Sequence, residues 1–280
     1  TSMVGELCRT TGSVTGYGDS VTYHQDEEPI GGSIIETSEG TEKEISLSAA
    51  QEEAYSKIKE IFAKGKPALL HGVTGSGKTE IYLKLAQETL AMGKNVLYLV
   101  PEIALSRQLE DRISETFPEL LVFHSGETMS RKREVATVLR HAGEPAEGKG
   151  YVVLGTRSAI FLPHKNLGLV IVDEEHDTSY KQDSPAPRYN GRETAIMMAK
   201  IFGANVILGS ATPSLESLYN CSVGRYGLVT LNKRFYDAAD SDIEIIDTIA
   251  ERRKNGMIGN FSRKLIEHIG KCLGEHRQVL

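Results

Sequence analysis

Short apolar segments alternate with longer helical segments along the chain from about residue 47. The short segments combine hydrophobic character with residues that favour β-structure, so we predict that they form strands. They lie near residues 67–71, 95–100, 120–124, 151–154, 168–172, 205–208 and 226–231. The run 167–172 is apolar on both faces of its predicted strand, as a strand buried in a parallel sheet requires.

The segments between the strands carry helical patterns. Ser48 and Gln51 have the spacing of a capping box, which predicts a helix that continues to about Ala63. Further helices are predicted near residues 80–92, 103–117, 130–142 and 190–202. This alternation is typical of an α/β fold with a mostly parallel sheet and helices on both faces. Ligands of such sheets bind at the carboxyl ends of the strands.

Residues 1–46 differ from the rest, because they are rich in Gly, Ser, Thr and acidic residues. We interpret them as a linker or the remnant of an upstream domain. They also account for the net charge of −6: the first 50 residues hold two basic and nine acidic side chains, and the remaining residues hold 30 and 29. A local basic face for nucleic acid therefore remains compatible with the composition.

The composition predicts a soluble cytoplasmic protein with no membrane partner. No segment approaches the roughly 18 apolar residues of a membrane span, and the first residues lack a signal-peptide pattern. Cys8, Cys221 and Cys272 lie far apart and form no CxxC pair. This arrangement predicts reduced thiols and argues against a zinc site within the chain.

The first predicted strand leads into a glycine-rich loop and then a helix. The loop and the first helical residues are Gly72, Val73, Thr74, Gly75, Ser76, Gly77, Lys78 and Thr79. Glycines allow backbone N–H groups to converge on phosphate oxygens, and the helix adds the positive end of its dipole. In this pattern Lys78 reaches the β- and γ-phosphates of ATP and Thr79 holds Mg²⁺. We therefore predict a site for ATP and Mg²⁺.

A second cluster of chemical groups follows the apolar strand 168–172. Asp173 lies at the strand end, where a carboxylate can hold Mg²⁺ through water, and Glu174 can orient and deprotonate an attacking water. Taken alone, these acids also suit a helix N-cap. Ser210 and Thr212 follow a later strand. They can meet His176 and link the nucleotide site to another part of the protein, and they can also cap the next helix.

Together these residues resemble the superfamily 2 nucleic-acid motors, and more closely the PriA family of bacterial replication-restart helicases. The resemblance covers about residues 47–280 and rests on the segments 72–80, 100–103, 124–126, 155–159, 173–182 and 209–213. It implies a RecA-like P-loop NTPase domain over residues 47–240. Residues 241–280 would connect this domain to a second RecA-like domain.

The resemblance also implies a function. It implies an ATP-dependent 3′-to-5′ DNA helicase that acts in primosome assembly and in the restart of stalled replication forks. The implied partners are single-stranded and forked DNA, the primosome proteins and single-strand-binding protein. Gln51 resembles the glutamine that reads adenine in many such motors. Its capping-box role is compatible with this, since one amide offers donors and an acceptor.

Two segments resemble the DNA-contact segments of these motors. Arg157 and Ser158 follow a strand tip, where they can hydrogen-bond a phosphate; the alternative for Arg157 is a surface ion pair. The segment 180–192 resembles an aromatic-rich loop that couples DNA binding to hydrolysis, although it lacks a tryptophan. Its candidate stacking and phosphate-binding residues are Tyr180, Lys181, Arg188, Tyr189 and Arg192. The alternative is a proline-rich connecting turn.

Relative to the family, the chain stops where the first strand of the second motor domain should begin. We expect the arginine finger, the zinc-binding cysteines and the DNA-end-binding domain to lie outside this chain, and residues 1–46 to be a remnant of a winged-helix domain. Zinc is expected only in the missing C-terminal part. Losing an arginine finger costs about 10³–10⁵ in rate. We therefore expect the chain alone to bind ATP–Mg²⁺ weakly and to hydrolyse it hardly at all.

Two other functions are compatible with the sequence. A double-strand DNA translocase of the restriction type shares the three core motifs, although the extension 180–182 favours the restart helicases. A nucleotide-gated scaffold would load partner proteins without unwinding DNA.

Overall fold

The computed structural model describes residues 45–102, 104–118, 120–141, 150–231 and 244–279. These residues form two compact units, one before and one after the segment 232–243, and each unit is described by itself. The predicted domain boundary at residue 240 and nearly all of the predicted appendage 1–46 lie outside the described residues. Among the helices that the structure describes, none is long and apolar enough to cross a membrane.

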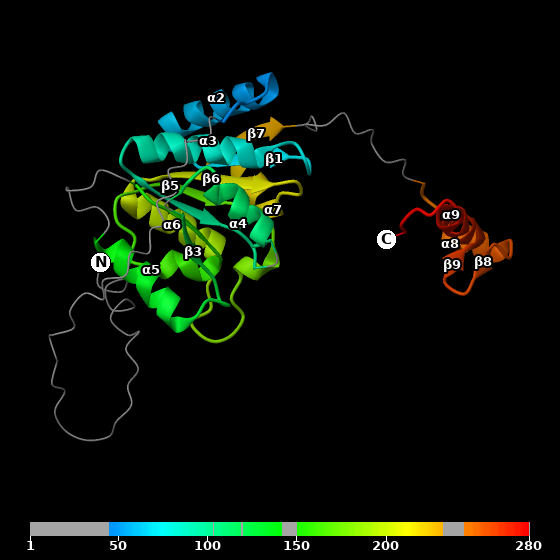
Figure 1. The fold of residues 1–280 in the computed structure, drawn as a ribbon. Helices are drawn as coiled ribbons and strands as arrows, with labels where there is room; N and C mark the ends of the chain where they lie inside the picture. The colour runs from blue at the N-terminus through cyan, green and yellow to red at the C-terminus, as the bar shows by residue number, and fades with distance from the viewer. Residues whose placement is uncertain (1–44, 103, 119, 142–149, 232–243, 280) are drawn as a thin grey trace. The chain divides into compact units, whose positions relative to one another are not determined.

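The first unit is built around a seven-stranded sheet in the order β3-β4-β2-β5-β6-β1-β7 (Figure 1). Every neighbouring pair of these strands is parallel. In chain order the strands are β1 (Ala68–Gly72), β2 (Asn95–Leu99), β3 (Leu120–Phe123), β4 (Val152–Gly155), β5 (Leu167–Val172), β6 (Asn205–Ser210) and β7 (Gly227–Leu231). Each predicted strand is present, and the predicted α/β fold with a mostly parallel sheet is confirmed.

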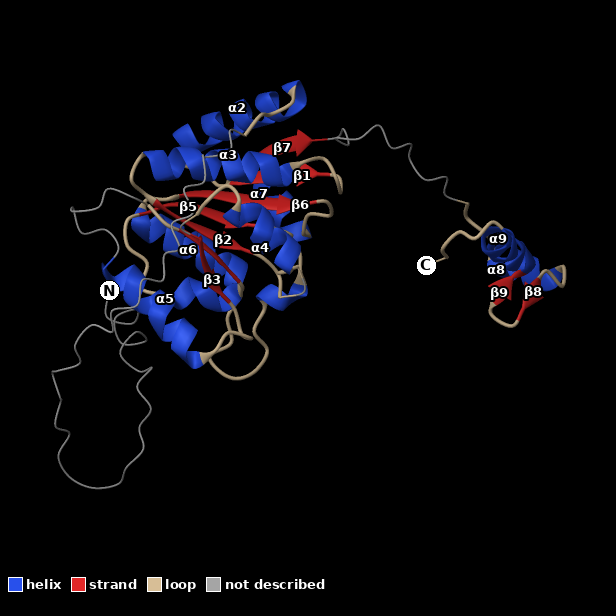
Figure 2. Cartoon of the chain, in the orientation of Figure 1, coloured by secondary structure: helices blue, strands red, loops and turns tan. Residues whose placement is uncertain are grey.

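Helices cover both faces of this sheet (Figure 2). In β2, Val96 and Tyr98 belong to one apolar core, and Leu97 and Leu99 belong to the other. The first core is completed by α2 (Ala49–Ala63), α3 (Lys78–Ala91) and α4 (Arg107–Ser114). The second is completed by α5 (Met129–His141), the 3₁₀ helix η1 (Arg157–Phe161), α6 (Gly191–Phe202) and α7 (Leu215–Ser222). Burial on both faces is what the continuous apolar runs predict.

Local capping sets where these helices begin. The capping box of Ser48 and Gln51 is present at the start of α2, as predicted. Helix α4 is shorter than the predicted 103–117, because the Ser106 hydroxyl accepts from the Leu109 N–H and fixes the start there. The helix that follows β6 is α7, whose bounds were not predicted, and Ser214 caps it. Its eight residues are too few for a clear periodic signal.

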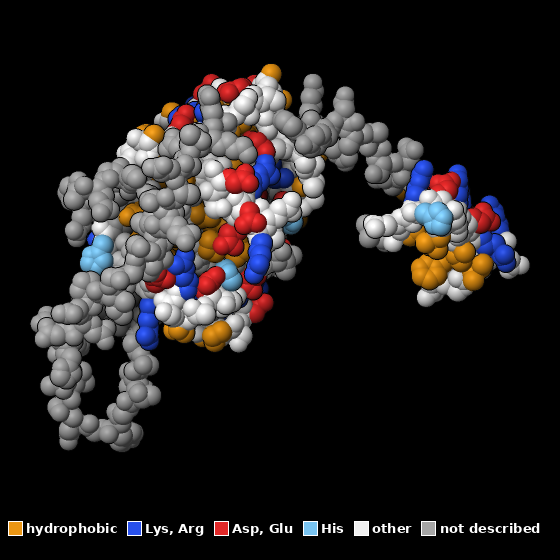
Figure 3. All heavy atoms as spheres, in the orientation of Figure 1, with side chains coloured by type: hydrophobic (Ala, Val, Ile, Leu, Met, Phe, Trp, Pro, Cys, Tyr) orange, Lys and Arg blue, Asp and Glu red, His pale blue; other side chains and the backbone are white. Residues whose placement is uncertain are grey.

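The second unit is small and consists of two helices separated by a two-stranded β-hairpin. It contains α8 (Thr248–Arg253), the antiparallel strands β8 (Met257–Ile258) and β9 (Phe261–Ser262), and α9 (Arg263–Gly274). Large hydrophobic side chains gather on its surface (Figure 3). The exposed ones include Ile249, Ile258, Phe261, Leu265 and Leu273. Because this unit is small, it leaves much of its apolar surface in contact with solvent.

The parallel topology determines where the chemistry of the first unit gathers. The carboxyl ends of parallel strands lie at one edge of the sheet. The loops that follow β1, β4, β5 and β6 all leave from this edge. Strand β6 lies between β5 and β1, so the loops after these three strands are neighbours.

Candidate functional site

The loop between β1 and α3 has the backbone of a tight glycine turn. Gly75 and Gly77 have φ angles of 76° and 80°, in the left-handed region that glycine adopts without strain. A Cβ on Gly77 would lie only 2.2 Å from Nε2 of Gln51. Glycine is therefore required at Gly77 both by the backbone angle and by the close approach of α2.

Two features of this loop fit a bound phosphate. The buried Oγ of Ser76 has no hydrogen-bond partner among the described residues. Helix α3 begins at Lys78, and among the described residues no side chain caps the N–H groups of its first turn. Buried polar groups are almost always hydrogen-bonded, and a helix N-terminus attracts anions. The residues present therefore suit a phosphate group.

Lys78 joins this loop to the carboxylates that follow β5. Its Nζ donates to the Gly72 carbonyl oxygen at 2.9 Å and lies 3.9 Å from Oε1 of Glu174. Thr79 is the next residue of α3. The lysine, the threonine and Glu174 are thus brought to one edge of the sheet by β1 and β5, which are not neighbours in the sequence.

Asp173 is half-buried, and several donors hold it in place. Tyr82 and Tyr98 donate to its carboxylate oxygens Oδ1 and Oδ2 at 3.2 and 3.5 Å. The N–H of Glu174 donates to Oδ1 at 3.0 Å, and the Tyr180 hydroxyl donates to the backbone oxygen of Asp173 at 2.7 Å. Burial raises the pKa of Asp173 to about 6. The neighbouring Glu174 contributes to this upward shift, and Lys78 opposes it.

Glu174 has a strained backbone. Its φ angle is 45°, in the left-handed region that costs a residue with a side chain roughly 1–2 kcal/mol. Such strain persists where the surrounding structure enforces it, and it clusters at functional sites. Here the turn after β5 directs the Glu174 carboxylate toward both Lys78 and His176, whose Nδ1 lies 3.6 Å from Oε2 of Glu174.

His176 meets the tip of β6, as one of the two sequence alternatives predicts. Its Nδ1 lies 2.8 Å from Oγ of Ser210, and its Nε2 lies 3.2 Å from Oγ1 of Thr212. The Thr212 N–H also donates to Ser210 Oγ at 2.9 Å. The imidazole therefore connects Glu174 with the loop that follows β6.

A buried ion pair at this edge was not predicted from the sequence. Glu175 Oε2 lies 2.7 Å from Nη1 of Arg192, and their side chains are 0% and 9% exposed. Ser214 and Ser217 also donate to the Glu175 carboxylate. The acidic residues 173–175 indicate a site in the sequence. However, nothing in the local sequence pattern indicates that Glu175 pairs with the distant Arg192.

The predicted DNA-contact residues fall into two groups. Tyr180 and Arg192 lie inside the protein, with exposures of 1% and 8%. A direct contact between either side chain and DNA is inconsistent with this burial. Lys181 and Arg188 are exposed, so they keep their predicted role as an expectation.

Arg157 and Tyr189 lie against each other, and their contact joins the two predicted DNA segments. Burial raises the pKa of the Tyr189 phenol, and the charge and hydrogen bond of the adjacent Arg157 oppose this shift. Arg157 also donates to the backbone oxygen of Ser179. The Tyr189 ring packs edge-on against Phe161 at 4.9 Å. Ser158 is half-buried, with its hydroxyl 3.5 Å from that of Thr156.

Gln51 uses its amide within the protein. Its Oε1 accepts from the N–H of Ser48 at 2.8 Å, and its Nε2 donates to the carbonyl of Gly77 at 3.1 Å. The residue is only 1% exposed. The cap and the phosphate loop are thereby joined, and adenine recognition by Gln51 stays a prediction.

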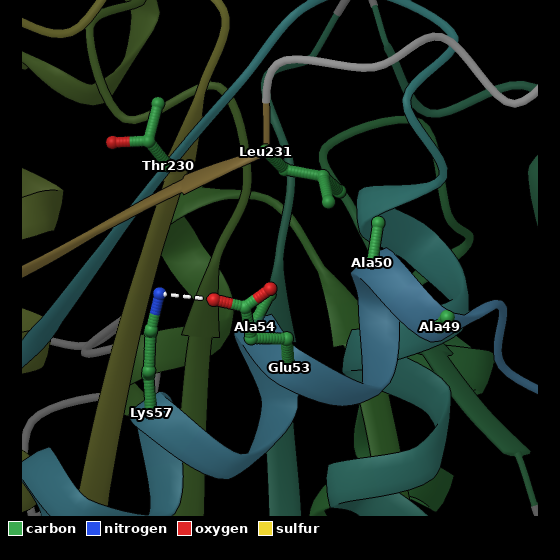
Figure 4. Close-up of a pocket in the computed structure, with 7 residues that line it drawn as sticks. All are labelled: Ala49, Ala50, Glu53, Ala54, Lys57, Thr230 and Leu231. Atoms are coloured by element: carbon green, nitrogen blue, oxygen red, sulfur yellow. Dashed lines mark hydrogen bonds and ion pairs between the residues drawn. The ribbon is translucent and has the colours of Figure 1, made fainter.

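A groove of about 340 Å³ lies elsewhere, between α2 and the strand β7 (Figure 4). Its polar side chains include Glu53 and Lys57, which form an ion pair at 2.7 Å. None of the residues that line it is a predicted site residue.

The parallel sheet, the phosphate loop and the strand-end carboxylates define a RecA-like P-loop NTPase fold. The protein family described as "Type III restriction enzyme, res subunit" matches residues 44–215. The chain therefore belongs to this family.

Comparison with individual proteins confirms the resemblance to PriA. The chain is 44% identical over 236 residues to the replication restart protein PriA of Rickettsia felis, a match that covers 84% of this chain and 34% of that protein. It is 38% identical to the PriA of Bacillus subtilis, over 84% of this chain and 29% of that protein. The chain thus spans about a third of the length of the curated relatives that it matches.

A solved structure supports the assignment of the fold. RecG bound to a three-way DNA junction aligns with a TM-score of 0.50 and 26% identity, over 71% of this chain and 25% of that chain. The alignment supports the α/β fold of the first unit.

Proposed function

We propose that this chain is the ATP-binding motor domain of a 3′-to-5′ DNA helicase that acts in primosome assembly and replication restart. The similarity to PriA proteins and to a helicase-type fold supports this proposal. The observation that carries it is the convergence of Lys78, Glu174 and His176 at one edge of the sheet. Single-stranded and forked DNA, the primosome proteins and single-strand-binding protein are the proposed partners. The proposed location is the cytoplasm.

In the proposed reaction, the loop amides and Lys78 bind the phosphates of ATP. Thr79 and Asp173 would hold Mg²⁺, which neutralises negative charge on the transferred phosphoryl group. The Glu174 carboxylate accepts a proton from the attacking water. Its position is set by the strained turn and by the nearby ammonium and imidazole groups.

The same geometry offers a route from ATP to DNA. His176 contacts both Glu174 and the loop that carries Ser210 and Thr212. A change at the nucleotide can therefore move this loop relative to β5. The exposed segment 181–188 starts a few residues after His176 and contains the candidate DNA contacts Lys181 and Arg188.

The substitution Glu174→Gln tests this function in the complete gene product. The amide keeps the size of the side chain but cannot accept the proton. We expect ATP binding to persist, ATP turnover to fall by about 10²–10⁴, and unwinding of forked DNA to stop. Glu216→Gln, an exposed acid in the first turn of α7, is the matched control. Unchanged turnover in Glu174→Gln would contradict the assignment, whereas loading of a partner helicase without turnover would favour a scaffold.

A double-strand DNA translocase is the second candidate, because the matching family is described from a restriction enzyme subunit. A translocase moves along intact duplex DNA. It can remove a third strand that is bound to a blunt-ended duplex without separating the two strands of that duplex. A helicase separates the strands of a fork. We expect the complete gene product to unwind forked DNA; displacement on blunt duplex alone would favour the translocase.

A further inference from the structure

Two tyrosine hydroxyls converge on the carboxylate of Asp173 from different elements of the first unit. Tyr82 comes from the second turn of α3, and Tyr98 comes from β2. Both residues are fully buried, and their rings pack edge-on at 5.8 Å. Phenylalanine would fill the same volume without placing a polar group in the core. The hydroxyls, and not the rings alone, therefore require an explanation.

Gly209 in β6 leaves the space that the Tyr82 hydroxyl occupies. A Cβ on Gly209 would lie 1.5 Å from that hydroxyl oxygen and 2.7 Å from the ring carbon that carries it. The same Cβ would lie 3.3 Å from Oδ1 of Asp173. Gly209 does not have a left-handed φ angle. Its lack of a side chain therefore serves the approach of Tyr82 to Asp173, and not a turn.

The donors leave one side of the Asp173 carboxylate available. An ionised carboxylate has about four lone-pair sites, two on each oxygen. On Oδ1, both sites are used by the Tyr82 hydroxyl and the Glu174 N–H. On Oδ2, the Tyr98 hydroxyl uses one site at the longer distance of 3.5 Å. Among the described residues, the remaining acceptor capacity is on Oδ2.

We propose that Tyr82 and Tyr98, with Gly209 making room for Tyr82, are positioning residues that orient the Asp173 carboxylate so that Oδ2 receives the divalent cation or its bound water. This inference rests on the proposed function, because it deepens the magnesium site of the same reaction. Groups that hydrogen-bond to a metal-binding side chain fix its orientation, and removing one typically costs about 10–100-fold in metal affinity or activity.

The test measures how much magnesium strengthens nucleotide binding by the 280-residue chain. ATP affinity is measured by calorimetry with Mg²⁺ and again with EDTA, and the ratio of the two affinities is compared between variants. We expect Tyr82→Phe to reduce this ratio by about tenfold and Tyr98→Phe to reduce it less, because its hydrogen bond is longer. Affinity in EDTA should stay unchanged. A role in packing alone would not change the ratio.

Tyr55→Phe is the matched control, since its hydroxyl donates to Glu88 between α2 and α3, outside the nucleotide site. Gly209→Ala is an independent second variant: its methyl group must displace the Tyr82 hydroxyl, so we expect a similar loss. Thermal unfolding confirms that each variant is folded.

The two proposals fail in different ways. A folded Tyr82→Phe variant with the wild-type magnesium ratio would overturn the positioning role and leave the proposed function standing. A wild-type chain whose ATP binding does not depend on Mg²⁺ would overturn the proposed function, and the positioning role with it.

Discussion

Glu175 and Arg192 form an ion pair inside the protein, with 2.7 Å between Oε2 and Nη1. The pair joins the turn after β5 to the first turn of α6. Ser214 extends it to the start of α7, since its hydroxyl accepts from Arg192 and its N–H donates to Glu175. One buried carboxylate therefore fixes three segments at the edge of the sheet that carries the candidate site.

Removing either partner of this pair should destabilise the chain strongly. Glu175→Ala leaves the guanidinium without its main acceptor, and Arg192→Ala leaves a buried carboxylate charged and underpaired. We expect each to lower the free energy of unfolding by about 3–5 kcal/mol, measured by urea denaturation. Lys57→Ala, which breaks the exposed Lys57–Glu53 pair, should cost at most about 1 kcal/mol. A loss below about 1 kcal/mol in Arg192→Ala would show that the pair is not structural.

His176→Ala should weaken the link between the nucleotide and DNA. The substitution removes the contacts to Ser210 and Thr212 but leaves Lys78 and Asp173 in place. In the complete gene product, we expect the effect of ATP on single-stranded DNA affinity to fall by at least about fivefold, within the usual range of coupling energies. His141→Ala, at the exposed end of α5, should change nothing. If ATP changed the single-stranded DNA affinity equally in His176→Ala and His141→Ala, His176 would have no role in linking the nucleotide site to DNA.

The raised pKa of Asp173 predicts a pH-dependent cost of folding. Its pKa rises from 3.8 to about 6 because of burial first and Glu174 second. The folded state therefore binds the proton more tightly than the unfolded state. The contribution of Asp173 to the free energy of unfolding is highest below about pH 4, where Asp173 is protonated in both states, and it falls as pH rises through about 6. Asp173→Asn lacks this cost. We expect the variant to be more stable than the wild type by about 1–3 kcal/mol at pH 7, with no difference near pH 4.

Urea denaturation at several pH values checks this prediction. Glu53→Gln is the control of opposite sign, because Lys57 lowers the pKa of the Glu53 carboxyl. Its charge stabilises the folded state above the ordinary pKa of 4.5, and this contribution disappears as pH falls. An Asp173→Asn difference that does not change between pH 4 and pH 7 would contradict the half-buried, charged state of Asp173.

Lys181 and Arg188 should bind DNA through phosphate charge. Both side chains are exposed on the segment 181–188. In the complete gene product, Lys181→Ala or Arg188→Ala should each lower single-stranded DNA affinity and reduce the slope of log affinity against log salt by about 0.7. Lys64→Ala, at the exposed end of α2, serves as the control. An unchanged slope in both variants would place the DNA path elsewhere.

The strands and the phosphate loop were predictable because their physical signals are local. Buried parallel strands require apolar residues on both faces, and this pattern can be read directly at residues 167–172. The approach of Lys78 to Glu174 follows from topology, since parallel strands end at one edge. Helix α7 and the start of α4 depend on single serine caps, which many loops also contain.

Other parts of the site could not be predicted, because they depend on contacts between distant residues. Arg192 belongs to a segment that suits DNA by its composition, yet Glu175 and Ser214 take its guanidinium. Tyr82 and Tyr98 have the pattern of ordinary core residues, and only the fold brings them to Asp173. Charge and periodicity describe single segments, whereas these roles are set by which segments meet.

Calorimetric titration of the 280-residue chain with ATP, with and without Mg²⁺, tests the central claim most directly. The account predicts magnesium-dependent binding in the wild type, because the loop amides, Lys78, Thr79 and Asp173 converge at one edge of the sheet. It also predicts that Lys78→Ala, which removes the ammonium from the site, loses this binding while keeping the wild-type Tm. A folded wild-type chain that shows no magnesium-dependent heat with ATP would contradict the account.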